Sequence, residues 1–218
     1  MKRICSYLPL LSLLLLSVPF ASAQSSVDFM LGFGTVHDSS NGGCIDTSTF
    51  AAYTSPSLDP AGPSACPTNP ALNGFFLGIG GDALIWKHFG IGGEINVQPS
   101  RANYGPFQYR ETFYDFDGIY APISQKRVQL LLEGGIGGAH TSWYQSQSVG
   151  SLFSQSYPVA TSNHFQLHAG VGLSLFVTEH IFIRPQFDLH YVPGFTDQFN
   201  SKLAPGATVW VGYNFGER

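Results

Sequence analysis

The stretch that decides the fold is FQLHAGVGLSLFVTEHIFIRPQFDLHYV, residues 165–192. Every second residue from Phe165 to Val177 is apolar, and the residues between them are mostly polar or glycine. After the short TEH sequence the same alternation resumes and continues to Tyr191. A period of two is the signature of a β-strand with two different faces. The stretch therefore predicts two antiparallel strands joined by a tight turn, and the question is which face is buried.

Period-two patterning recurs along the whole chain. Eight segments show it: Val27–His37, Gly74–Trp86, Phe89–Gln98, Glu111–Ala121, Val128–Thr141, His164–Thr178, Ile181–Val192 and Ala207–Phe215. Each is about as long as the 9–11 residues that a tilted strand needs to cross a bilayer, or somewhat longer. Long and short connections alternate between them, as in a barrel with long loops on one side and tight turns on the other.

Composition indicates where the apolar face points. Charged residues make up 11% of the chain and aromatic residues 14%, whereas soluble domains carry roughly 25% charged residues. The face opposite the apolar one carries glycine and isolated ionisable groups, not the lysine and glutamate of a sheet that faces water. The interior of a narrow eight-stranded barrel is just wide enough for side chains. We therefore predict an all-β fold, an eight-stranded antiparallel transmembrane β-barrel with its apolar face against lipid; a secreted soluble β-protein is the alternative.

The first residues are typical of a secretory signal peptide. Lys2 and Arg3 precede a leucine-rich run, and Ala21-Ser22-Ala23 supplies the small residues of a cleavage site. We expect a signal peptide at residues 1–23 and a barrel domain at 24–218, with a long outer loop at about 38–73. Cys44 and Cys66 lie in this loop. Because an exported chain enters an oxidising compartment, they are predicted to form a disulfide bond.

The end of the chain strengthens the prediction of a barrel. Residues 206–215, GATVWVGYNF, form an aromatic-ended last strand with an apolar face of Val209, Val211, Tyr213 and Phe215. With the alternating loops, this resembles the outer-membrane β-barrel family typified by the OmpA transmembrane domain, over nearly all of residues 24–218. The resemblance implies the outer membrane of a Gram-negative-type bacterium, contacts with its lipids and lipopolysaccharide, and assembly by the barrel assembly machinery through those four residues.

We expect a structural or surface-interaction role through the extracellular loops, with no catalysis and no cofactor. A small passive pore for ions or small solutes is the first alternative. An outer-membrane lipid A-modifying esterase is the second, because His37 and Ser39 faintly resemble the His-x-Ser pair of lipid A deacylases, although no acidic partner is assigned. The chain has no basic patch of the kind that binds nucleic acid.

Five ionisable residues fall on the polar faces and are predicted to form a network in the lumen: Asp82, Glu94, Glu133, Arg184 and Asp188. Arg184 is the one clear cation among them. We expect it to bridge Glu94 or Glu133 and, with inward-pointing aromatic side chains, to close the barrel. The alternative is a narrow pore that prefers cations.

Three histidines, His164, His168 and His190, are placed in the lumen near the outer mouth. If paired residues of the sixth and seventh segments have numbers that sum to 358, His168 lies opposite His190. A sum of 360 separates them by one pair. Polar filling of the lumen is the simpler interpretation, and a metal site or a pH-sensitive latch is the alternative; no metal is assigned. Aromatic residues near strand ends are predicted to form interfacial girdles: Trp86, Tyr104, Tyr109, Tyr120, Trp143 and Tyr191.

Overall fold

The structure is a computed structural model that describes residues 26–38, 72–104, 107–149, 153–199 and 201–216. The predicted signal peptide, most of the long outer loop, the Cys44–Cys66 disulfide bond and Ser39 lie outside these residues. Among the described residues, no helix is long and apolar enough to cross a membrane.

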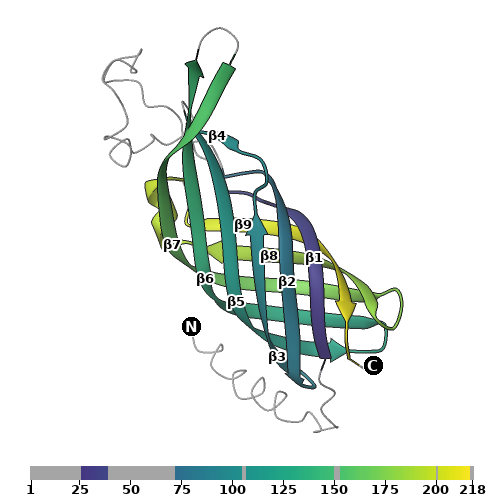
Figure 1. Cartoon of the computed structure of the whole chain (residues 1–218). Coiled ribbons are helices and arrows are strands. Elements are labelled where there is room, and N and C mark those ends of the chain that lie inside the picture. Colours follow the sequence, from purple (N-terminus) through teal and green to yellow (C-terminus); the bar gives the residue numbers. More distant parts are fainter. Residues whose placement is uncertain (1–25, 39–71, 105–106, 150–152, 200, 217–218) are drawn as a thin grey trace, which may run out of the picture.

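Nearly all of the described chain is β-structure. The strands are β1 (Ser26–Val36), β2 (Phe75–Trp86), β3 (Phe89–Val97), β4 (Ala102–Tyr104), β5 (Phe107–Ser124), β6 (Val128–Val149), β7 (Phe153–Phe176), β8 (Ile181–Tyr191) and β9 (Leu203–Asn214), with a short 3₁₀ helix η3 (Pro193–Asp197). Neighbours pair antiparallel in the order β3-β2-β1-β9-β8-β7-β6-β5-β4, and an additional β3–β5 pairing closes the sheet (Figure 1). Eight long strands thus form the barrel and β4 is an addition at one edge of β5, which confirms the predicted eight-stranded fold.

The outer surface of the barrel is apolar. On β1, Val27, Phe29, Leu31 and Phe33 are 47–57% exposed, while the residues between them face inward. The same alternation continues around the other strands. A contiguous apolar face of this size gains by contact with lipid, and closure leaves no unpaired strand edge within the bilayer. The apolar face therefore points outward, to lipid, as predicted.

Glycines of the inner face make room for large side chains. A Cβ atom at Gly32 or Gly78 would collide with the Trp210 ring. A Cβ at Gly92 would lie 2.6 Å from the Asp82 carboxylate. The glycine-rich segments around Gly78 and Gly92 are thus accounted for by a crowded lumen, in agreement with the interpretation of the opposite face as the barrel interior.

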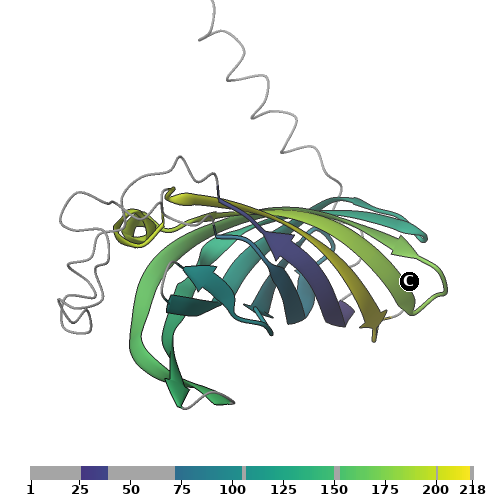
Figure 2. The same ribbon diagram turned by 90° about the horizontal axis from the view of Figure 1, so that it is seen from above.

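Two strands are much longer than the alternation predicted. β6 continues to Val149 and β7 begins at Phe153, so most of the expected outer loop between residues 141 and 164 is a paired ribbon. Both views show it projecting beyond the other strands (Figures 1 and 2). Outward residues such as Ser142 and Thr161 are polar, because this part no longer touches lipid. The hydrophobic alternation therefore ends while backbone pairing continues.

Two residues assigned to the aromatic girdle lie inside the barrel. Tyr109 and Trp143 are 0% and 1% exposed. The prediction was wrong because β5 begins at Phe107 rather than at residue 111, so Tyr109 continues the inward parity of Phe113. Trp86, Tyr120 and Tyr191 do lie on the outer face, where Tyr120 stacks on Phe89. The side chain of Tyr104 is outside the described part of the structure.

Candidate functional site

Arg184 is the centre of a buried ion network inside the barrel. It lies on β8 and is fully buried. Its Nη1 is 2.5 Å from Asp82 Oδ2, and its Nη2 is 3.3 Å from Asp28 Oδ2. Its Nε donates to Ser174 Oγ at 2.8 Å, and Nη1 is 3.7 Å from Glu133 Oε1. One guanidinium group from β8 thus contacts side chains from β1, β2, β6 and β7 across the lumen.

The network differs in part from the one expected from sequence. Glu133 is within ion-pair distance of Arg184, but Glu94 is not among the contacts of Arg184 in the described lumen. Instead, Gln186 Nε2 lies 2.9 Å from Glu94 Oε1, 3.3 Å from Glu133 Oε2 and 2.8 Å from Asp188 Oδ1. An amide rather than a guanidinium therefore links these three carboxylates, because Gln186 is the next inward residue of β8 after Arg184.

Sequence reasoning missed Asp28 as a partner of Arg184. Its inward parity on the first segment was visible, but the pairing of β1 with β2 and β9 was not. The register places Asp28 opposite Asp82 on one side and opposite Asn214 on the other. Two aspartates in one pair need a cation nearby, and Arg184 supplies it.

The three predicted lumen histidines separate into a pair and a single residue. His168 of β7 pairs with His190 of β8, which is the register with a sum of 358. The two rings are stacked, with centroids 5.0 Å apart. His164 lies higher in the mouth, where its Nε2 is 3.3 Å from Gln198 Oε1 and its ring meets Phe195 edge-on.

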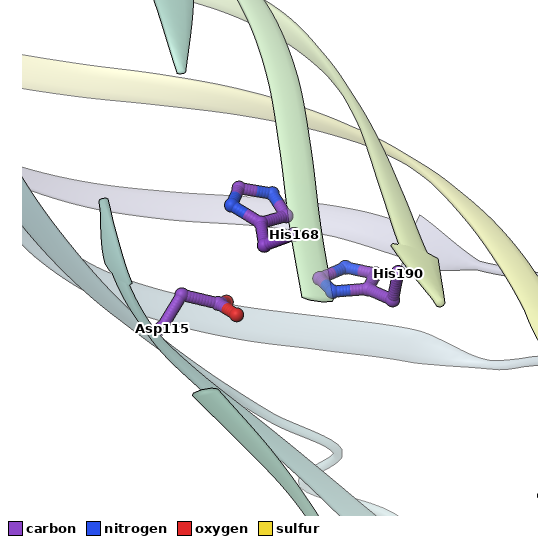
Figure 3. Close-up of side chains that lie close together, drawn as sticks. All are labelled: Asp115, His168 and His190. Carbon is purple, nitrogen blue, oxygen red and sulfur yellow. The ribbon is translucent and has the colours of Figure 1, made fainter. Parts of the chain in front are cut away.

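Carboxylates from β5 face the histidine pair. His168 Nδ1 lies 2.9 Å from Asp117 Oδ1, and its Nε2 lies 3.4 Å from Asp188 Oδ1. Asp115, also on β5, points towards both rings (Figure 3). Asp115 and Asp117 were not predicted as site residues because ETFYDFDGIYA, residues 111–121, is the least regular segment. The signal was present, however: its acidic residues at 111, 115 and 117 share one parity.

Both ends of this polar layer are covered by apolar side chains. At the outer mouth, η3 and the residues after it bring Phe195 and Phe199 against Tyr109, Phe113 and Trp143. The Phe113 ring stacks on His190 with centroids 4.5 Å apart. At the other end a second cluster consists of Met30, Phe176, Phe182 and Trp210. The described lumen is therefore packed rather than open, as in other narrow barrels.

The lumen holds far more acidic than basic groups. Eight buried carboxylates face inward from the strands: Asp28, Asp82, Glu94, Glu111, Asp115, Asp117, Glu133 and Asp188. Among the described residues Arg184 is the one buried arginine, and no lysine is buried. Buried carboxylates are costly unless they are paired, protonated or bound to a cation. This excess of acid is the main electrostatic feature of the interior.

A closed antiparallel barrel with an apolar exterior and a packed polar lumen has the fold of outer-membrane β-barrel proteins. Solved structures agree. The attachment invasion locus protein Ail of Yersinia pestis, in complex with the heparin analogue sucrose octasulfate, is similar with a TM-score of 0.53 and 12% identity, covering 88% of this chain and 99% of that chain. A second Ail structure gives 0.51 and 13%, over 89% and 100%.

A major outer membrane protein from Thermus thermophilus is also similar, with a TM-score of 0.53 and 11% identity over 87% of this chain and 99% of that chain. No protein-family model matches the sequence, and no curated protein matches it. At these identities the likeness establishes the fold, the eight-stranded outer-membrane barrel.

Proposed function

We propose that this chain is a closed outer-membrane barrel that presents the β6–β7 ribbon and the neighbouring loops at the cell surface for interaction with a partner, and that it catalyses no reaction. The observation that carries the proposal is the length of the ribbon. Among the described side chains of β6, Ile136 is the last large apolar one that is exposed on the outer face, and the strand continues to Val149. From Gly138 to Val149 it extends about 36 Å at the usual rise of about 3.3 Å per residue.

Towards its tip, past Ser162 and His164, whose side chains contact Gln198, one edge of the ribbon pairs with no other described strand. β5 pairs with β6 as far as Gln145, and β8 pairs with β7 as far as Leu167. Among the described residues, the part of β7 before Leu167 therefore pairs with β6 alone. A free edge of this kind can accept a strand from another protein, with affinity from main-chain hydrogen bonds. An unpaired edge exposes backbone N–H and C=O groups, which promote aggregation unless a partner strand pairs with them or neighbouring side chains shield them.

The packed lumen favours an anchor over a pore. Arg184 and its carboxylate partners fill the middle, and the aromatic cluster that contains Phe113 and Phe199 covers the outer mouth. A surface role is compatible with the fold, since the similar barrel Ail is an attachment invasion locus protein. Its complex with a heparin analogue is a property of Ail. The described outer part of this chain offers few cations for a sulfated ligand, namely Arg101, Arg110 and Lys202.

Three further features belong to the same proposal. The chain is placed in the outer membrane of a Gram-negative-type bacterium, in contact with its lipids and lipopolysaccharide. The barrel assembly machinery engages β9 and the residue that follows it, through Val209, Val211, Tyr213 and Phe215. A signal peptide at residues 1–23 directs export, and the Cys44–Cys66 disulfide bond restrains the first outer loop.

The test compares cells that lack the protein, cells that express it, and cells that express a variant without residues 146–155, which removes the tip of the ribbon. Heat-modifiable migration on gels confirms that the shortened barrel is folded. We expect cells that express the shortened variant to lose attachment to surfaces or to other cells. Their outer membrane should still exclude dyes as well as that of cells with the full-length protein. Equal attachment by both forms would refute the role of the ribbon.

Conductance of the purified barrel in planar bilayers tests the alternative of a pore. We expect no stepwise conductance from the wild-type protein, because both ends of the polar layer are covered. Stable channels that change selectivity in Glu133→Gln would favour a pore instead. The second alternative, an esterase, rests on His37 and Ser39, and Ser39→Ala should leave every measured property unchanged.

A further inference from the structure

Asp115, His168 and His190 converge from three strands on one point of the lumen. Asp115 comes from β5, whereas His168 and His190 come from the paired strands β7 and β8 on the other side of β6. One potential ligand atom from each lies within 4.8 Å of those of the other two, and all three residues are buried. Figure 3 shows the carboxylate of Asp115 directed at the two imidazole rings.

Two of these ligand groups are buried with an atom that has no partner. Asp115 Oδ1 accepts a hydrogen bond from Gln166 Nε2, but Asp115 Oδ2 has no partner among the described residues. His190 Nδ1 is likewise without one in the described lumen, although His190 is only 2% exposed and is enclosed between Phe113 and His168. Buried polar atoms are normally satisfied. Both atoms belong to residues of this one group, so a ligand bound there could satisfy them together.

Both ring nitrogens of His168 face carboxylates, and one of the two contacts matches the arrangement found behind a metal-ligating imidazole. Its Nδ1 makes the shorter contact, 2.9 Å to Asp117 Oδ1, while Nε2 is at 3.4 Å from Asp188 Oδ1. Histidines that bind metals commonly hold the second ring nitrogen against a carboxylate, which fixes the orientation of the ring. Asp117 supplies that carboxylate, and the long Nε2 contact is the one that a metal ion would replace.

Charge favours a cation at this point. Asp115, Asp117 and Asp188 surround the two imidazoles, and Arg184, the one buried arginine of the described lumen, makes its ion pairs with Asp28, Asp82 and Glu133 instead. Within the described part of the chain, the carboxylates near His168 therefore have no arginine or lysine of their own. A divalent cation would offset this negative charge.

We propose that Asp115, His168 and His190 bind a divalent first-row transition-metal ion, for which Zn²⁺ is the representative, with Asp117 and Asp188 as its outer carboxylates. Two imidazoles and a carboxylate are ligands that suit Zn²⁺, Ni²⁺ and Cu²⁺ rather than Mg²⁺ or Ca²⁺. Bond lengths of about 2.0–2.2 Å place tetrahedral ligand atoms roughly 3.3 Å apart. The three ligand atoms, which now lie within 4.8 Å of one another, therefore move closer together on binding. Rotation of the Asp115 side chain and of the two stacked imidazole rings allows this movement.

The bound ion would join β5 to the β7–β8 hairpin below the outer mouth. Because Phe113 and Phe195 cover the site, the ion enters during folding or through a transient opening, and it leaves slowly. This inference does not depend on the proposed surface role, since the site lies inside the barrel and not on the ribbon.

The test uses tag-free protein in a Cys44→Ser/Cys66→Ser background, so that neither a histidine tag nor a thiol can bind the ion. The protein is refolded with ZnCl₂ and passed through gel filtration, and retained zinc is measured by atomic emission. We expect about one equivalent in this parent protein and at least tenfold weaker binding in His168→Gln and His190→Gln. His164→Gln is the matched control, because His164 is also a lumen histidine near the mouth but lies outside the group; it should bind like the parent.

Cu²⁺ in place of Zn²⁺ gives a readout that a purely structural role would not change. Electron paramagnetic resonance should show coupling to two nitrogens in the parent and in His164→Gln, and to one in His190→Gln. Heat-modifiable migration separates folded from misfolded variants. A folded parent that retains no metal, or equal retention in all the variants, would overturn the proposal.

Discussion

Replacement of Arg184 by methionine tests the ion network directly. The substitution keeps much of the side-chain volume but removes the one guanidinium that contacts Asp28, Asp82 and Glu133. Loss of one partner from a buried ion pair costs about 3–5 kcal/mol, because the remaining charge is buried and uncompensated. We expect Arg184→Met to lower the free energy of unfolding by that amount, towards the upper end because three carboxylates are affected.

The matched control removes a charge from the surface. Lys126 Nζ lies 3.8 Å from Glu179 Oε1, and the two side chains are 72% and 76% exposed. An exposed pair of this kind contributes about 0–1 kcal/mol, so Lys126→Met should have little effect. Both variants are refolded into lipid vesicles and unfolded in urea, with tryptophan fluorescence as the signal.

A double-mutant cycle sharpens the result. Asp82→Asn alone should be destabilising, because it removes the 2.5 Å partner of Arg184. In the Arg184→Met background the same change should cost less, or even stabilise, since it removes one of the uncompensated charges. We expect a coupling energy of about 1–3 kcal/mol. Equal losses in Arg184→Met and Lys126→Met, or strict additivity in the cycle, would refute the network as the centre of the lumen.

Three further substitutions test the two faces of the barrel and its mouth by urea unfolding in vesicles. Leu31→Arg places a charge on the lipid face and should cost about 2–4 kcal/mol; a neutral effect would mean that this face does not contact lipid. Gly32→Ala brings a Cβ atom into collision with the Trp210 ring and should cost about 1–3 kcal/mol, and considerably less in a Trp210→Ala background, whereas an unchanged cost there would exclude the ring as the cause. Trp143→Ala opens a cavity in the aromatic cluster at the outer mouth and should lower the free energy of unfolding by about 3–5 kcal/mol. Trp86→Ala on the exposed outer face should lower it by less than half as much. The reverse order would place Trp143 in the interfacial girdle.

The fold could be predicted from sequence because lipid imposes a strong period-two signal. Wherever a strand crosses the bilayer, as in residues 165–177, outward residues are apolar and inward residues are polar or small. Where β6 and β7 leave the bilayer, both faces are polar or mixed, and the signal ends although pairing continues to Val149 and Phe153. Strand ends outside the membrane are therefore the part of the fold that alternation cannot locate.

The sequence predicts which residues face the lumen, but not which of them contact one another. Parity places Arg184, Glu133 and Asp188 inside, but the choice of partners depends on the register of strands that are far apart in sequence. Asp28 lies 156 positions from Arg184, and their contact follows from the β1–β9 and β8–β9 pairings together. The His168–His190 pairing was accessible from sequence because a short turn restricts that hairpin to a few registers.

The measurement that tests the central claim most directly is migration of the membrane-fractionated protein on gels before and after boiling. If the chain forms a closed barrel with its apolar face in lipid, it is found in the outer-membrane fraction. Its unboiled band then migrates differently from the boiled one, because a closed sheet resists detergent until it is heated. A product that fractionates without detergent and shows one band under both conditions would contradict the account, and would make the apolar face a core or a ligand cavity.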